Sequence, residues 1–167
     1  MLCFILDARG TGNASSPPVG GLDPEDLATA RRIRERGCAK LGLVPMHAGV
    51  EIMPTAQRLA RAFAVLGDRV DILDTESPPA AAGGTATPGP DARPAVLERA
   101  LEDACARADR VLVAFAPPAG AGPAASLLYA LDGVVLVARA GGATEFRMHK
   151  WLRRIDKQRQ LGVLLVE

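Results

Sequence analysis

Short apolar runs alternate with segments of helical periodicity along most of the chain. Six runs rich in Val, Ile and Leu are expected to form buried strands: residues 2–6, 41–44, 70–73, 111–115, 134–137 and 163–166. Five segments with apolar positions three or four residues apart are expected to form helices: residues 23–36, 55–66, 93–108, 124–131 and 144–158. This alternation predicts a parallel sheet with right-handed crossovers, and therefore a three-layer α/β/α domain.

Two segments rich in Gly, Pro, Ser and Ala interrupt the alternation. They span residues 10–21 and 77–91, and both lack the apolar side chains needed for packing, so we expect mobile loops. The first loop separates the first strand from everything that follows. We therefore divide the chain into an N-terminal strand with a flexible loop, residues 1–21, and a single α/β domain, residues 22–167.

Composition narrows the class of protein further. With 49% hydrophobic but only 4% aromatic residues, the core must consist mainly of Ala, Val and Leu. A net charge of +1 gives no field that would favour nucleic acid. The three cysteines and two histidines lack the spacing of a disulfide framework or a zinc site. No apolar run is long enough for a membrane span or a signal peptide, so we expect a cytoplasmic protein.

Residues 58–76, RLARAFAVLGDRVDILDTE, resemble the NLAxALAxLGxRVLLIDAD segment of the MinD/ParA ATPases and the related bacterial tyrosine kinases. The spacing matches without a gap. In this segment Ala60, Ala62 and Ala64 are expected where the helix nears the sheet, and Gly67 is expected to end the helix with a left-handed cap. The match thus contains a packing signal as well as a family signal.

Further stretches resemble the same family in the same order. ADRVLVAFAPP, residues 108–118, is similar to the YDYVLIDTPP strand and loop, and LDGVVLVARAG, residues 131–141, is similar to the strand that follows it. RRIRERG, residues 31–37, is similar to the basic helix before the ATP-binding loop of the tyrosine kinases. The final GVLLVE is similar to the family's GvvlN strand. The resemblance implies a P-loop NTPase-like, Rossmann-like topology.

The phosphate-binding loop of this family is degenerate here. In the ungapped register, Gly49, Val50, Glu51, Ile52 and Met53 occupy the family's G-V-G-K-T positions. Ile52 replaces the lysine that contacts the β and γ phosphates, Glu51 replaces a glycine of the backbone nest, and Met53 replaces the hydroxyl that holds Mg²⁺. Each replacement removes an interaction with nucleotide, so the Walker A motif is expected to be lost.

Of the family's catalytic residue types, only two acids remain. Asp74 and Glu76 follow the strand at residues 70–73, where the resemblance implies water positioning and contact with magnesium. The aspartate of DTPP is absent, because residues 114–116 read Ala-Phe-Ala, and Pro54 removes a backbone N–H at the start of the helix. The alternative interpretation of Asp74 and Glu76 is that they are solvated loop residues, and we favour it.

Other candidate sites each have a simpler explanation. The glycines of residues 10–12 lack the third glycine of a dinucleotide-binding loop. His47 is close to the degenerate loop but has no base, acid or metal partner in the sequence. The basic positions of residues 31–36 and 144–158 suit either an anionic surface or ordinary hydrated helix faces, and we favour the second interpretation. Tyr129 is the only tyrosine, which argues against the tyrosine clusters of the kinases.

These observations favour a non-catalytic pseudo-ATPase domain that binds a protein partner or a second copy of itself. The resemblance implies a setting in exopolysaccharide synthesis or export. In this interpretation the chain has no cofactor and no metal site. The alternative is a weak nucleotide-binding ATPase that uses Asp74 and Glu76 with Mg-ATP or Mg-ADP. Peripheral membrane contact through the basic helices is a further, less favoured, alternative.

Overall fold

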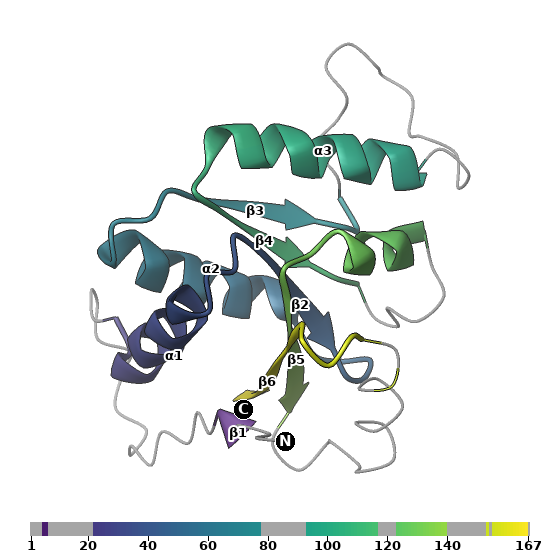
Figure 1. The fold of residues 1–167 in the computed structure, drawn as a ribbon. Coiled ribbons are helices and arrows are strands. Elements are labelled where there is room, and N and C mark those ends of the chain that lie inside the picture. The colour runs from purple at the N-terminus through teal and green to yellow at the C-terminus, as the bar shows by residue number, and fades with distance from the viewer. Residues whose placement is uncertain are drawn as a thin grey trace.

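The computed structural model describes residues 5–6, 22–77, 93–116, 123–139, 153 and 155–166. All described strands join one parallel sheet of six strands in the order β1-β6-β5-β2-β4-β3 (Figure 1). The strands are β1 (Ile5–Leu6), β2 (Lys40–Pro45), β3 (Val70–Asp74), β4 (Arg110–Ala114), β5 (Gly133–Arg139) and β6 (Gln160–Val166). The predicted parallel α/β architecture is confirmed.

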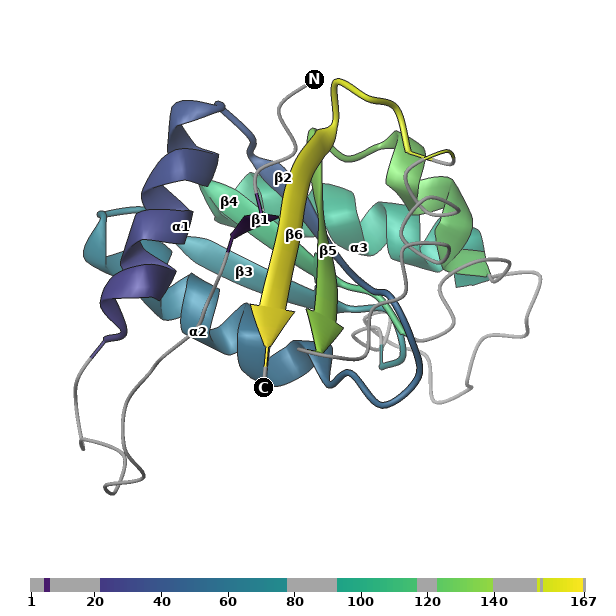
Figure 2. The same ribbon diagram turned by 90° about the horizontal axis from the view of Figure 1, so that it is seen from below.

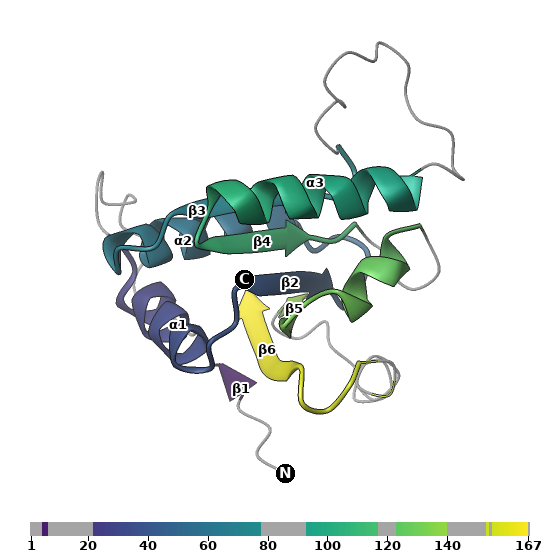
Figure 3. The ribbon, with the colours of Figure 1, turned by 45° about the horizontal axis from the view of Figure 1, so that its top comes forward.

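Helices cover both faces of this sheet. The α-helices are α1 (Pro24–Glu35), α2 (Ile52–Val65) and α3 (Arg93–Arg107), and a 3₁₀-helix, η1 (Pro123–Tyr129), follows β4. Helices α1 and α2 pack on one face, and α3 and η1 pack on the other (Figure 3). None of the helices in the described part of the chain is long and apolar enough to cross a membrane.

Local sequence signals set the ends of α1 and α2. Asp23 caps α1, because its Oδ1 accepts a hydrogen bond of 2.9 Å from the backbone N–H of Glu25, and Pro24 occupies the first helical position. Gly67 follows α2 with a φ of +90°, so the predicted left-handed cap is confirmed.

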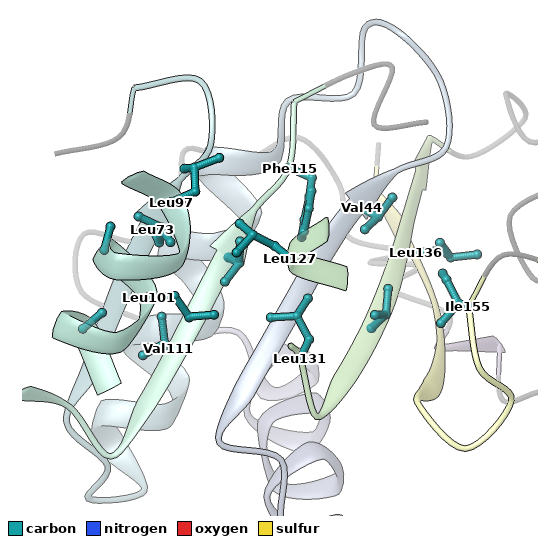
Figure 4. Packing of buried hydrophobic residues seen from close by; sticks show 14 of the residues in the cluster. Val44, Leu73, Leu97, Leu101, Val111, Phe115, Leu127, Leu131, Leu136 and Ile155 are labelled. Atoms are coloured by element: carbon teal, nitrogen blue, oxygen red, sulfur yellow. The ribbon is translucent and has the colours of Figure 1, made fainter. Parts of the chain in front are cut away.

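The core consists of two apolar layers separated by the sheet. Side chains of β2 alternate between them: Leu41 and Leu43 face α1 and α2, whereas Val44 faces α3 and η1. Figure 4 shows the second layer, in which Leu97 of α3 and Leu127 of η1 lie over the strands. Burial on both faces explains why the central strands are continuous apolar runs rather than alternating ones.

Three details of the sequence prediction are wrong. The strand at 70–73 was expected to be buried, but β3 is an edge strand in which only Leu73 is buried. Ala62 is fully buried, whereas Ala64 is exposed, because positions two apart cannot share one helix face. The expected helix at 124–131 is the 3₁₀-helix η1.

The helix expected at residues 144–158 is wrong at its C-terminal end. Residues 155–159 form a bend and a turn, in which Oδ1 of Asp156 accepts a hydrogen bond of 3.0 Å from the N–H of Gln158. Ile155 is nevertheless buried among the residues of the α3 layer, as its apolar position suggested. The strand β6 then begins at Gln160, three residues before the predicted start. The residues of this segment from 144 to 152 lie outside the described part of the chain.

The two described residues of the N-terminal segment pair with β6. Ile5 lies opposite Val163, and Leu6 lies opposite Leu164, so β1 forms one edge of the sheet. The division of the chain at residue 21 remains a prediction. Of the loops expected at 10–21 and 77–91, only Ser77 is among the described residues.

Two arginines and an aspartate form a charged network at the amino ends of β3 and β4. The Asp68 carboxylate lies 3.3 Å from Nε of Arg110 and 3.7 Å from Nε of Arg34. The Arg110 guanidinium also lies over the Phe63 ring, with its Cζ 4.5 Å from the ring centroid. The Arg110 side chain is only 8% exposed, and its Nη1 has no hydrogen-bond partner in the part of the chain described above. This network joins α1, α2 and β4 through a buried cation.

An exposed ion pair lies beside this network. Nε and Nη2 of Arg69 donate hydrogen bonds of 3.0 and 2.9 Å to the two carboxylate oxygens of Asp109. The backbone N–H of Arg69 also donates to Asp109 Oδ2. These hydrogen bonds lower the pKa of Asp109 to about 2. The pair fixes the turn before β3 against the turn before β4.

Gly42 is placed where no larger residue fits. A Cβ at this position in β2 would lie 2.5 Å from Cδ1 of Leu131 and 3.2 Å from Cε2 of Phe115, both of which are buried. We expect Gly42→Ala to lower the free energy of unfolding by about 1–3 kcal/mol, as overpacking of a core does. Urea denaturation measures this loss. In Gly42→Ala/Leu131→Ala the new methyl group has room, so the double variant should lose less than the sum of the single losses; additive losses would contradict the proposed clash.

Candidate functional site

The carboxyl ends of β2, β3 and β4 meet at one edge of the sheet, beside the start of α2 (Figure 1). A pocket of about 320 Å³ opens there, which we call the strand-end pocket. Its lining comes from three segments: residues 49–54, the two acids after β3, and residues 114–116 after and at the end of β4. The structure therefore brings Gly49, Val50, Glu51, Ile52 and Met53 together with Asp74 and Glu76, as the resemblance implied.

The loop between β2 and α2 is held in place by apolar side chains. The N–H of Met46 donates a hydrogen bond of 2.9 Å to the carbonyl oxygen of Val137, which continues the pairing of β2 with β5. Gly49 has a φ of +92°, a conformation that favours glycine. Val50 is 4% exposed and Ile52 is 6% exposed, and both pack in the core beneath α1 and α2. The residue at the family's lysine position is thus a core residue.

The first turn of α2 offers few donors to an anion. Glu51 is the N-cap residue, but its side chain makes no capping hydrogen bond, so the first amides of α2 lack a side-chain acceptor. Pro54 is the third residue of the helix and has no N–H to give. Only the amides of Ile52 and Met53 remain free of the helix's own hydrogen bonds in this turn.

A threonine between the two acids fixes the ends of β3 and β4 to each other. The N–H of Thr75 donates to the carbonyl oxygen of Ala114 at 3.0 Å, and its Oγ1 accepts from the N–H of Ala116 at 3.1 Å. Oδ1 of Asp74 accepts a hydrogen bond of 2.9 Å from the N–H of Glu76. Thr75 is 6% exposed, and its role was not predicted from the sequence. The available signal was a hydroxyl residue between acids at a strand end.

The charges of the strand-end pocket have one sign. Among the described residues that line it, Glu51, Asp74 and Glu76 are acidic, and none is a lysine, arginine or histidine. A triphosphate placed there would meet three carboxylates and no side-chain cation. Within the described ranges, no group of three His, Cys, Asp or Glu side chains is arranged to hold a metal ion.

His47 does not join this lining. Its Nδ1 lies 3.1 Å from the carbonyl oxygen of Ala48, and its Nε2 is buried with no hydrogen-bond partner among the described residues. Of the other candidates, Tyr129 is 77% exposed at the end of η1. The glycines of residues 10–12 and the basic positions of residues 144–152 lie outside the described residues.

A second pocket, of about 590 Å³, lies on the other side of the first turn of α2, and we call it the arginine pocket. Its lining residues come from the start of α1, from α2 and from the carboxyl ends of β5 and β6. Figure 2 shows how these elements are arranged. The lining residues are Asp23, Asp26, Val50, Glu51, Pro54, Thr55, Gln57, Arg58, Arg61, Arg139, Leu165 and Val166. Burial raises the pKa of Asp26, and the nearby Arg58 opposes that rise.

The chain is a parallel α/β domain, and both pockets lie at the carboxyl ends of its strands. Ligands of open parallel α/β sheets generally bind at this edge of the sheet. Solved structures with this fold include bacterial tyrosine-kinase domains. The chain matches the BceF tyrosine kinase domain with a TM-score of 0.61 and 18% identity, over 84% of this chain and 74% of that one. It matches the kinase domain of the Escherichia coli tyrosine kinase ETK with a TM-score of 0.66 and 16% identity, over 93% and 82%.

A third match is the chimerical protein CapA2B2, with a TM-score of 0.70 and 14% identity, over 89% of this chain and 85% of that chain. No family model and no curated protein matches the sequence. The fold expected from the resemblance of residues 58–76 is confirmed by these structures. At such identities the likeness concerns the fold, and activity must be argued from the residues of the site.

Proposed function

We propose that this chain is a non-catalytic binding or regulatory domain, a pseudo-ATPase that acts through a protein partner or a second copy of itself. The observation that supports it most is the lining of the strand-end pocket. Glu51, Asp74 and Glu76 supply only negative charge there, and the Ile52 side chain belongs to the core. A phosphate site needs cations and free amides, whereas the side chains with charge in the strand-end pocket are acids.

The setting that we propose is exopolysaccharide synthesis or export. The support is the resemblance of residues 58–76, 108–118 and 131–141 to the bacterial tyrosine-kinase branch, together with a fold shared with its kinase domains. In that setting the domain would serve as a scaffold or as the dimer partner of an active component. Sedimentation analysis of the purified chain, alone and with candidate partners, measures this association.

Isothermal titration with Mg-ATP and with Mg-ADP at millimolar concentrations tests the loss of nucleotide binding. We expect no saturable heat from either nucleotide, because the strand-end pocket places carboxylates where phosphates would have to lie. Saturable binding at micromolar concentration would overturn the proposal of a pseudo-ATPase.

One alternative has a specific observation in its favour. Asp74 and Glu76 line the same pocket as the free amides of Ile52 and Met53, so Mg²⁺ on the acids with phosphate on the amides is a coherent arrangement. Asp74→Asn and Glu76→Gln distinguish the two functions if wild-type protein binds nucleotide. Loss of Mg-dependent binding in both variants would establish the alternative, a weak Mg-nucleotide-binding ATPase.

A further inference from the structure

The arginine pocket contains three arginines from two elements of the fold. Arg58 and Arg61 lie one turn apart on α2, and Arg139 is the last residue of β5. Nε of Arg58 lies 3.5 Å from Oδ2 of Asp26 on α1, so this cation already has a partner. Arg61 and Arg139 are both exposed, and within the described part of the chain neither makes an ion pair or a hydrogen bond. Two guanidinium groups therefore line one pocket without a carboxylate partner among the described residues.

The acids that share the pocket are largely committed to local structure. Asp23 caps α1 through the N–H of Glu25, and Asp26, whose side chain is 9% exposed, lies beside Arg58. Glu51 lies on the side of the pocket next to the strand-end pocket, since it lines both. Among the described residues, the guanidinium groups of this lining without a carboxylate partner are those of Arg61 on α2 and Arg139 on β5, and Glu51 is the one acid of the lining that remains beside them.

We propose that the arginine pocket binds a small molecule carrying a carboxylate or phosphate group, held between Arg61 and Arg139. A guanidinium presents a planar fork of N–H donors that fits both groups in a bidentate manner. The volume of about 590 Å³ lies within the range of small-molecule sites. Leu165 and Val166 at the end of β6 supply apolar surface for the carbon part of such a ligand. This site goes beyond the proposed function, which concerns nucleotide in the strand-end pocket.

Isothermal titration with inorganic phosphate and with succinate, at constant ionic strength, tests the site. We expect saturable binding of at least one anion at millimolar concentration, and the anion that binds identifies the ligand group. Arg61→Gln and Arg139→Gln should each weaken it by about tenfold, which corresponds to the loss of one charge-assisted hydrogen bond. Arg32→Gln is the matched control, because Arg32 is exposed on α1 and lines neither pocket.

Three results would overturn the site. The first is that neither anion shows saturable binding to the wild-type protein. The second is that the Arg61→Gln/Arg139→Gln variant binds with the wild-type affinity. The third is that Arg32→Gln weakens binding as much as the pocket variants do. Circular dichroism of each variant checks that the fold is intact, and both pocket arginines are exposed, so folding should not depend on them. Nucleotide titrations leave this test unaffected, because phosphate and succinate contain no base or sugar.

Discussion

Replacing Asp68 with alanine should lower the free energy of unfolding by about 3 kcal/mol, since removal of one partner from a buried ion pair leaves an uncompensated charge. The Arg110 guanidinium would remain over the Phe63 ring, 8% exposed, without its carboxylate partner. Arg34, which is half exposed, would lose its partner too but remains hydrated. Urea denaturation followed by circular dichroism measures the loss.

Two further variants test whether the loss of stability in Asp68→Ala comes from a buried charge. Arg110→Met should cost less than Asp68→Ala, because the methionine fills the space over Phe63 and Asp68 keeps Arg34 at 3.7 Å. Arg107→Ala breaks a surface ion pair with Asp71 at 2.9 Å, in which the arginine side chain is 63% exposed, and should cost no more than about 1 kcal/mol. Equal losses in Asp68→Ala and Arg107→Ala would contradict the role of burial.

The second prediction concerns the family's lysine position. Ile52→Lys should lower the free energy of unfolding by roughly 3 kcal/mol, because it places an ammonium group where a side chain is 6% exposed and packed in the core. The same variant should show no saturable heat with Mg-ATP. Lysine alone does not remove the carboxylates of Glu51, Asp74 and Glu76 from the strand-end pocket.

Ile52→Leu is the control for this variant, since a swap of similar volume usually costs under about 1.5 kcal/mol. Thermal denaturation and titration of both variants give the two readouts. A stable Ile52→Lys protein that binds Mg-ATP would contradict our interpretation. It would mean that a lysine side chain at position 52 reaches from the lining into the strand-end pocket, and that this lysine was the missing part of a nucleotide site.

The two pockets differ in the side chains that line them. The same turn at the start of α2 separates an acidic pocket from one with unpaired arginines. Our two proposals together assign anion binding to the arginine pocket and not to the strand-end pocket. A ligand bound between α2 and β5 would contact both the helix and the sheet, and would thereby stabilise the folded chain.

Much of the fold followed from the sequence because its signals are local. Continuous apolar runs such as residues 111–115 indicate strands covered on both faces, and Gly67 marks a helix end that only a positive φ satisfies. Gly49, Glu51 and Asp74 lie at or after the ends of predicted strands, and the carboxyl ends of parallel strands meet at one edge of the sheet, so these residues line one pocket.

Other features depended on contacts between distant residues. Periodicity did not reveal that β3 is an edge strand, because strand order is set by pairing across the sheet. The turn at residues 155–159 replaced the end of an expected helix, because the Asp156 side chain accepts a hydrogen bond from the N–H of Gln158 and β6 begins early. The role of Thr75 in joining β3 to β4 follows from the pairing of these two strands, which the sequence does not specify.

The sequence by itself determined the alternation of strands and helices and the parallel α/β class, since each depends on residue type and local spacing. Only the tertiary structure decided that Ile52 is buried in the core, that Arg110 lies between Asp68 and Phe63, and that Arg61 and Arg139 line one pocket. Burial and charge pairing arise between elements far apart in the chain, and no local pattern encodes them.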